Sequence, residues 1–290
     1  MKDERRKELG LYLRARRSQA LRSDYGLPPV GRSRERGLRR EEVAFLSGVS
    51  VTWYTWLEQG RDISPSRQVL ESIARALHLS DTGLSYVLSL GGYSSARSQG
   101  PVAANVPAHV QRLLDALDPN PSYALSPDWG VAGWNRAYEA LYPNIGTFDA
   151  GDRNLLWLVF TDPYVRDLLP DWDVTSKRFL AEFRAETGQR LGDPDVAYQV
   201  ERLKEASPEF QESWDRYDIL GFESRERLFH HPAVGVLQLE HHQVSPSDRP
   251  DLHIVVYTPA PGSDAGEQMQ RLLSSNQELK IGQADRLRRV

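Results

Sequence analysis

One stretch, residues 41–60 (EEVAFLSGVSVTWYTWLEQG), limits what this chain can fold into more than any other. It has the pattern of two short helices joined by a tight turn. Gly48 lies where such a corner needs a left-handed backbone conformation, which glycine adopts without a clash at Cβ. Val49 is apolar within the turn and should face the core, and Ser50 is a good N-cap for the second helix. The pattern predicts a helix–turn–helix whose second helix exposes its first turns, as recognition of a DNA major groove requires.

Helical patterns also surround this motif. They predict helices over residues 3–20, 39–47, 52–59, 66–77 and 81–90. The helix at 66–77 has a marked start, because Ser64 can cap it and Pro65 suits a first helical position. No segment of residues 1–90 alternates like a strand. We therefore expect an all-α N-terminal domain of five helices.

Charge is divided unevenly along the 290 residues, although the formal net charge is only −4. Residues 1–80 hold 16 basic and 10 acidic side chains, which leaves 20 basic and 30 acidic ones in residues 81–290. The basic first part favours a nucleic-acid partner, and the acidic remainder does not. The chain has no Cys, which excludes disulfides, thiolate metal sites and cysteine nucleophiles. With no long apolar run and no secretory signal, we expect a cytoplasmic protein without membrane insertion.

The second half of the chain differs from the first in composition and in its predicted secondary structure. Residues 91–107 are rich in Gly, Ser, Ala and Pro, which is typical of a domain boundary. Two short strands are predicted within residues 122–134 and two β-rich segments at 234–244 and 252–258. Helical patterns lie between them and at the end, over residues 135–141, 154–160, 175–187, 194–206 and 267–275. This order predicts an α+β domain with an antiparallel sheet and helices on one face.

The motifs resemble a known family. GLRREEVAFLSGVSVTWYTWLEQGR and SPSRQVLESIARALHL resemble the phage-repressor-like helix–turn–helix regulators of the XRE type. DWGVAGWNRAYEAL, NLLWLVFTDP, DWDVTSKRFLAEFRAE, SPEFQESWDRYDI and HPAVGVLQL follow in order and resemble the MmyB-like ligand-binding domain, which has a PAS-type fold. The resemblance implies a DNA-binding domain at 1–92, a linker at 93–106, a PAS-like domain at 107–278 and a tail at 279–290.

For the helix–turn–helix, the resemblance implies which residues contact operator DNA. Val51 and Thr52 open the recognition helix and would contact base edges, with Trp56 one turn later. Arg40 and Gln59 would contact phosphate, which positions the module without reading sequence. The remaining residues expected at this surface are Arg39, Ser50, Trp53 and Arg61. The usual polar readers of the family are absent, and Trp53 and Trp56 could pack on a sugar edge or on the neighbouring subunit. Tyr54 is expected in the core. Arg32, Arg34 and Arg36 form a basic loop that either reaches DNA or is merely solvated.

For the second domain, the resemblance implies a cavity that holds a long apolar ligand such as a fatty acid. Leu155, Val159, Phe160, Phe179 and Phe183 are the expected lining or core residues. An acyl carboxylate would need a polar anchor. The candidates are Asn154, Arg178, Arg184 and His231, and Arg184 could equally be a structural ion-pair partner.

An enzymatic second domain is the less favoured alternative. Neighbouring histidines, such as those at 230–231 and 241–242, point to opposite faces of a strand, and no metal-binding or nucleophile motif is present. His231-Pro232 is expected to shape the start of a strand.

We therefore expect a regulator that binds double-stranded operator DNA as a homodimer and responds to a small apolar ligand, with no required cofactor or metal. The alternative is a second domain that only dimerises or recruits a protein partner.

Overall fold

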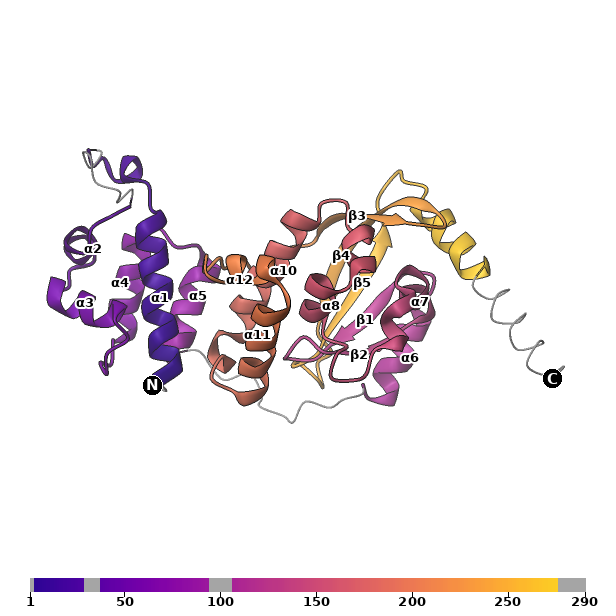
Figure 1. Ribbon diagram of the computed structural model, residues 1–290, viewed down its shortest axis with the longest axis horizontal. Helices are drawn as coiled ribbons and strands as arrows, with labels where there is room; N and C mark the ends of the chain where they lie inside the picture. The colour runs from indigo at the N-terminus through magenta and orange to yellow at the C-terminus, as the bar shows by residue number, and fades with distance from the viewer. Residues whose placement is uncertain (1–2, 29–36, 94–105, 276–290) are drawn as a thin grey trace. The chain divides into compact units, whose positions relative to one another are not determined.

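The computed structural model describes residues 3–28, 37–93 and 106–275 (Figure 1). Contacts within the chain divide it into two compact units. The first, here called the N-terminal unit, joins the described residues of Met1–Ala96 to Leu180–Gly221. The second, here called the sheet unit, joins the described residues of Arg97–Phe179 to those of Phe222–Val290.

The N-terminal unit contains the five helices expected from the sequence. They are α1 (Asp3–Gln19), α2 (Arg40–Ser47), α3 (Val51–Glu58), α4 (Arg67–Ala76) and α5 (Asp81–Leu90), with a short 3-10 helix η1 (Arg22–Tyr25) after α1. Serine N-caps begin three of them. Ser50 accepts a hydrogen bond from the backbone NH of Trp53, and Ser80 caps α5 in the same way. The cap of α4 is Ser66, not Ser64 as expected, because the Ser66 side chain is the one that accepts from the NH of Val69.

The core of this unit is built from one face of each helix. α1 contributes Leu9 and Leu13, α2 contributes Val43, and α4 contributes Leu70 and Ile73, all fully buried. Leu70 and Ile73 therefore mark the buried face of α4.

Residues 180–221 belong to this unit, although the sequence places them among the residues of the second domain. They comprise the end of α10 (Trp172–Thr187), a 3-10 turn η3 (Gly188–Arg190), α11 (Pro194–Ala206) and α12 (Pro208–Trp214). Ala185, Tyr217 and Ile219 join the same apolar cluster as the helix–turn–helix core. The predicted linker at 93–106 lies almost entirely outside the described residues, and the predicted tail at 279–290 lies wholly outside them.

The sheet unit is built on one antiparallel sheet of five strands. In chain order they are β1 (Ser122–Leu125), β2 (Val131–Trp134), β3 (Arg225–His231), β4 (Gly235–Val244) and β5 (His253–Pro259), and in the sheet they lie in the order β2-β1-β5-β4-β3. Sequence analysis predicted all of these strands except β3. It also placed His231-Pro232 at a strand start, whereas His231 ends β3 and Pro232 lies in the turn to β4.

The helices of this unit pack on both faces of the sheet, not on one as expected. α6 (Ala108–Ala116) packs its Val110 and Leu114 against Ala124 of β1 and Ile254 of β5. The neighbouring strand residues Tyr123 and Val255 point the other way, because side chains alternate along a strand. The helices between β2 and β3 are α7 (Arg136–Leu141), a 3-10 turn η2 (Pro143–Thr147), α8 (Leu155–Thr161), α9 (Pro163–Leu168) and the first half of α10. Figure 1 shows the strands as one twisted sheet flanked by helices. Residues 265–275 form a last helix.

Candidate DNA-reading surface and ligand cavity

The turn between α2 and α3 has the geometry that the sequence predicts. Gly48 adopts a left-handed conformation with φ of 72°. The next amide, of Val49, donates to the carbonyl of Ala44 over 3.0 Å, which closes the end of α2. Val49 itself is half-buried against the core. Ser50 then starts α3, and the two helices are held at a fixed angle by these local bonds.

The side chains of α3 divide into two faces. Val51, Thr52 and Trp56 are exposed, whereas Tyr54 and Leu57 are buried as expected. Trp53 is half-buried and packs against the core cluster. Trp53 therefore lies at the border between the exposed and the buried face of α3. The exposed face is the one that a DNA groove can reach.

The residues expected to contact phosphate differ in their exposure and in whether they are paired with another residue of the protein. Arg39, Gln59 and Arg61 are exposed at the ends of α2 and α3, as is Ser50 at the N-cap of α3. The Arg61 guanidinium lies 5.8 Å from the centre of the Trp56 ring. Arg40, by contrast, forms an ion pair within the protein through its Nε, although its side chain remains 39% exposed. The basic loop residues Arg32, Arg34 and Arg36 lie outside the described residues.

That ion pair is centred on Glu58, the last residue of α3, whose side chain is only 1% exposed. It accepts from the Nε atoms of Arg17 at 2.5 Å and of Arg40 at 2.7 Å. Arg17 also donates from Nη1 to the carbonyl of Leu38 at 2.7 Å. Burial raises the pKa of the nearby Tyr54, and Glu58 raises it further. Glu58 therefore ties α3 to α1 and to the start of α2.

A narrow apolar cavity lies in the sheet unit between the sheet and the helices α7 to α10. Its volume is about 40 Å³. The sheet contributes Tyr123, Phe229 and Tyr257, α8 contributes Leu155 and Val159, and α10 contributes Phe179. Arg227 of β3 is the charged residue among these lining residues. The cavity is therefore apolar with one cationic group in its wall.

Arg227 is 7% exposed and incompletely paired. Its Nε donates to Nδ1 of His241 at 3.3 Å, and its guanidinium lies 4.3 Å from the centre of the Phe179 ring. Among the described residues, its Nη2 atom has no hydrogen-bond partner. Burial holds the pKa of His241 well below 6.5, and the charge of Arg227 lowers it further. His241 is thus neutral at pH 7 and leaves the charge of Arg227 uncompensated.

An open groove adjoins the cavity, because Leu169 and Arg227 line both. Its volume is about 330 Å³. Arg178 and Arg225 lie along it, together with the exposed Val174 and Leu228. Arg227 therefore borders both the narrow cavity and the open groove.

The ligand residues predicted from the sequence fall into two groups. Leu155, Val159 and Phe179 line the cavity, and Arg178 lines the adjoining groove. The others do not line the cavity, and each has a different role. Asn154 caps α8 by accepting from the amides of Leu156 and Trp157, and Phe160 packs edge-on against Trp172.

His231 lies within 3.2 Å of the carbonyl of Ala140, and burial lowers its pKa. Phe183 and Arg184 belong to the N-terminal unit, on the half of α10 that follows Phe179. Sequence reasoning missed Arg227 because β3 was not identified as a strand. The signal was present in RERLFHH, where Arg227, Phe229 and His231 alternate onto one buried face.

The described residues contain no cluster of three or more His, Asp or Glu side chains that could hold a metal ion. No helix among them combines the length and the apolar character needed to cross a membrane.

Comparison with known families agrees with these two surfaces. Residues 8–85 match a helix-turn-helix domain, and residues 106–273 match the MmyB-like transcription regulator ligand binding domain. No curated protein matches the chain. The first match contains α2 and α3, the second contains the cavity and covers more than half of the chain, and both domain families are regulatory. The chain therefore belongs to the helix-turn-helix transcription regulators that carry an MmyB-like ligand-binding domain.

Proposed function

We propose that this regulator senses an apolar monocarboxylate of the fatty-acid class, which binds in the cavity with its carboxylate on Arg227. The observation that carries the proposal is the buried, uncompensated guanidinium in an otherwise apolar wall. A buried charge without a partner is strongly unfavourable. A ligand that brings one carboxylate and an apolar chain would satisfy both the charge and the surrounding surface.

The small size of the cavity adds a condition. Pockets for drug-sized ligands typically hold about 300–1,000 Å³. At about 40 Å³, this cavity is much smaller. A long acyl chain would therefore enter only by moving wall residues such as Phe179 and Val159 apart. The PAS-type fold expected from the resemblance stays a prediction, which the five-stranded antiparallel sheet supports.

On the DNA side, the proposal assigns base contacts to Val51, Thr52 and Trp56 and phosphate contacts to Arg39 and Arg61. Exposure of these side chains supports the assignment. Ser50 and Gln59 are exposed at the two ends of α3 and could also contact the backbone of DNA. Arg40 would serve mainly to hold Glu58. We also propose that two copies bind paired half-sites in the cytoplasm, as helix–turn–helix dimers do.

Palmitate binding to the full chain tests the ligand assignment, measured by isothermal titration calorimetry. Arg227→Met should weaken palmitate binding by roughly 10- to 150-fold, because a hydrogen bond to a charged group is worth about 1.5–3 kcal/mol. Hexadecanol has the same chain length without the charge. Its affinity for the native protein should be lower than that of palmitate by a similar factor. Arg178→Met is the matched control, since Arg178 lines only the open groove, and it should retain most of the affinity.

Equal palmitate affinity for the native protein and for Arg227→Met would refute Arg227 as the anchor. If the native protein binds no palmitate at all, the sensing proposal fails. The alternative, a second domain that only dimerises or recruits a protein, would then be favoured.

A further inference from the structure

Residues 180–221 match the ligand-binding family by sequence, yet they fold with the DNA-binding helices. Gly188 shows how closely the two parts approach. A Cβ atom added at Gly188 would lie only 2.2 Å from the ring of Tyr86 on α5. The segment is therefore packed tightly against the helix–turn–helix domain.

A buried charge network holds the segment from the side of α10. Arg184 is 0% exposed, and its Nη1 donates to the carbonyl of Trp214 at 2.8 Å. Its Nε lies 3.3 Å from Oε1 of Glu8 on α1. The same Glu8 oxygen accepts from the Tyr86 hydroxyl at 2.6 Å. Arg184 thus connects α10 to α1 and, through Glu8, to α5.

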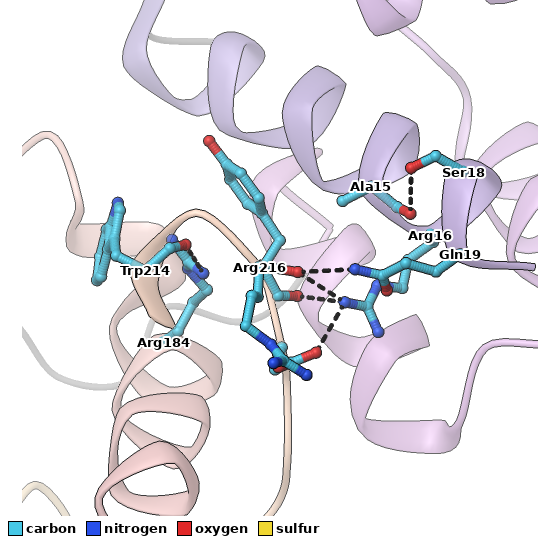
Figure 2. A network of polar contacts seen from close by, with 9 residues as sticks. Ala15, Arg16, Ser18, Gln19, Arg184, Trp214 and Arg216 are labelled. Carbon is cyan, nitrogen blue, oxygen red and sulfur yellow. Dashed lines mark hydrogen bonds and ion pairs between the residues drawn. The ribbon is translucent and has the colours of Figure 1, made fainter. Parts of the chain in front are cut away.

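A second set of contacts holds the same segment from the end of α1. Arg16 donates to the carbonyls of Arg216 and Tyr217, each at 3.0 Å, and to the carboxylate of Asp218 at 3.1 Å. Gln19 donates to the carbonyl of Arg216 at 3.1 Å. Figure 2 shows these side chains converging on the turn after α12, with Arg184 bonded to Trp214 on its other side. We call the Arg16 and Gln19 contacts the α1 clamp.

The helices that carry these contacts, α10 and α1, also carry residues of the cavity and of the support for the recognition helix. Phe179, which lines the cavity, precedes Arg184 by five residues on the same helix. Arg16 in the clamp is followed directly by Arg17, which holds Glu58 at the end of α3. Helix α10 therefore contains both a cavity-lining residue and Arg184. The C-terminal end of α1 carries both the clamp and the Arg17 contact to the recognition helix α3.

We propose that residues 180–221 are a transmission segment, which passes cavity occupancy from Phe179 through the α1 clamp to the recognition helix. The inference rests on the proposed function, because it takes ligand binding in the cavity as the event that changes DNA binding. Filling the narrow cavity displaces Phe179, and α10 carries that displacement to the contacts with α1. The ligand then changes DNA affinity by as much as it favours one arrangement of these contacts over the other.

The test compares the full chain with the clamp variant Arg16→Ala/Gln19→Ala. Ser18→Ala is the matched control, because Ser18 lies on the same turn and its hydroxyl donates to the carbonyl of Ala15 in its own helix. DNA affinity is measured by fluorescence anisotropy, with and without palmitate, on a duplex selected from a random library by the native protein. The native protein and Ser18→Ala should show a palmitate-dependent change of roughly 5- to 150-fold. The clamp variant should bind palmitate and DNA but show a change close to onefold.

A ligand-free arm separates this inference from the proposed ligand. Val159→Phe adds bulk inside the cavity and should alter DNA affinity in the native background. In the clamp background the same substitution should have little effect, so the two changes are non-additive in a double-mutant cycle. Equal effects of Val159→Phe in both backgrounds, or no effect in either, would overturn the transmission segment whatever palmitate does. Absence of palmitate binding combined with a non-additive cycle would refute the fatty-acid ligand and leave the transmission segment supported.

Discussion

Three buried charged residues differ in whether an opposite charge lies beside them. This difference indicates which of them stabilise the fold and which one can bind a ligand. Glu58 is neutralised by Arg17 and Arg40, and Arg184 by Glu8. Arg227 has a neutral histidine and an aromatic ring as its neighbours. A buried residue whose charge is offset by an opposite charge holds the fold together. A buried cation that lacks a counter-charge is the one that a ligand can complete.

The pairing of Glu58 gives the first prediction. Glu58→Ala should destabilise the protein by about 3 kcal/mol, since removing one partner of a buried pair leaves the other charge uncompensated. The value lies at the low end of the usual range because the Arg40 side chain is 39% exposed and water can solvate it. Urea unfolding followed by tryptophan fluorescence measures the change. Glu41→Ala, an exposed substitution on α2, is the control and should stay within about 0.5 kcal/mol of the native protein.

At the scale of the element, local signals predicted most helices and strands. The elements not predicted are β3, α6 and the short helices α9 and α12. Helix starts were indicated by serine caps and apolar periodicity, although α4 is capped two residues later than expected. Strand β3 was missed because arginine and histidine occupy its buried positions, so its alternation is not one of apolar and polar residues. α6 was missed because it follows the Gly/Ser/Pro-rich stretch without a strong start signal. β3 forms one edge of the sheet. α6 covers the face of the sheet that carries Ala124 and Ile254.

The turn between α2 and α3 allows a prediction at this scale. Gly48→Ala should cost about 1–2 kcal/mol, because a left-handed conformation brings Cβ close to the following carbonyl. Apart from Gly48 and its two chain neighbours, no atom of the described residues lies within 4 Å of the added Cβ, so the cost comes from the local backbone. Thermal unfolding would measure it. Gly151→Ala is the matched control, since that glycine also has open space around it but no left-handed φ, and it should unfold at or above the native temperature. An equal loss in both variants would contradict the backbone explanation.

At the scale of the whole molecule, the net charge of −4 describes neither functional surface. The basic excess lies in residues 1–80, which contain α2 and α3, and the acidic excess lies in residues 81–290. This division favours approach of the helix–turn–helix to DNA and disfavours contact by the remainder. The charge division cannot by itself distinguish an exposed arginine such as Arg39 from one that is paired with a buried carboxylate, such as Arg40.

The salt dependence of DNA binding makes that distinction. Replacing Arg39 or Arg61 with alanine should reduce the slope of log affinity against log salt by about 0.9 for each arginine that contacts a phosphate. Lys177→Ala, an exposed charge removed from the sheet unit, should leave the slope unchanged. The slopes come from anisotropy titrations of the full chain between roughly 50 and 200 mM salt. An unaltered slope in the two arginine variants would remove them from the DNA contact.

The sequence alone determined the helix–turn–helix, its glycine corner, its exposed and buried faces and most of the strand positions. These features depend on residues close together in the chain, where periodicity, caps and turns carry the information. Only the tertiary structure decided that Arg40 pairs with Glu58, that Arg227 lies in the cavity wall, and that residues 180–221 pack on the DNA-binding helices. Each of these depends on which side chains meet across long separations. A polar residue's identity does not specify its partner, because the same arginine can bind phosphate, a buried carboxylate or a ligand according to where the fold places it.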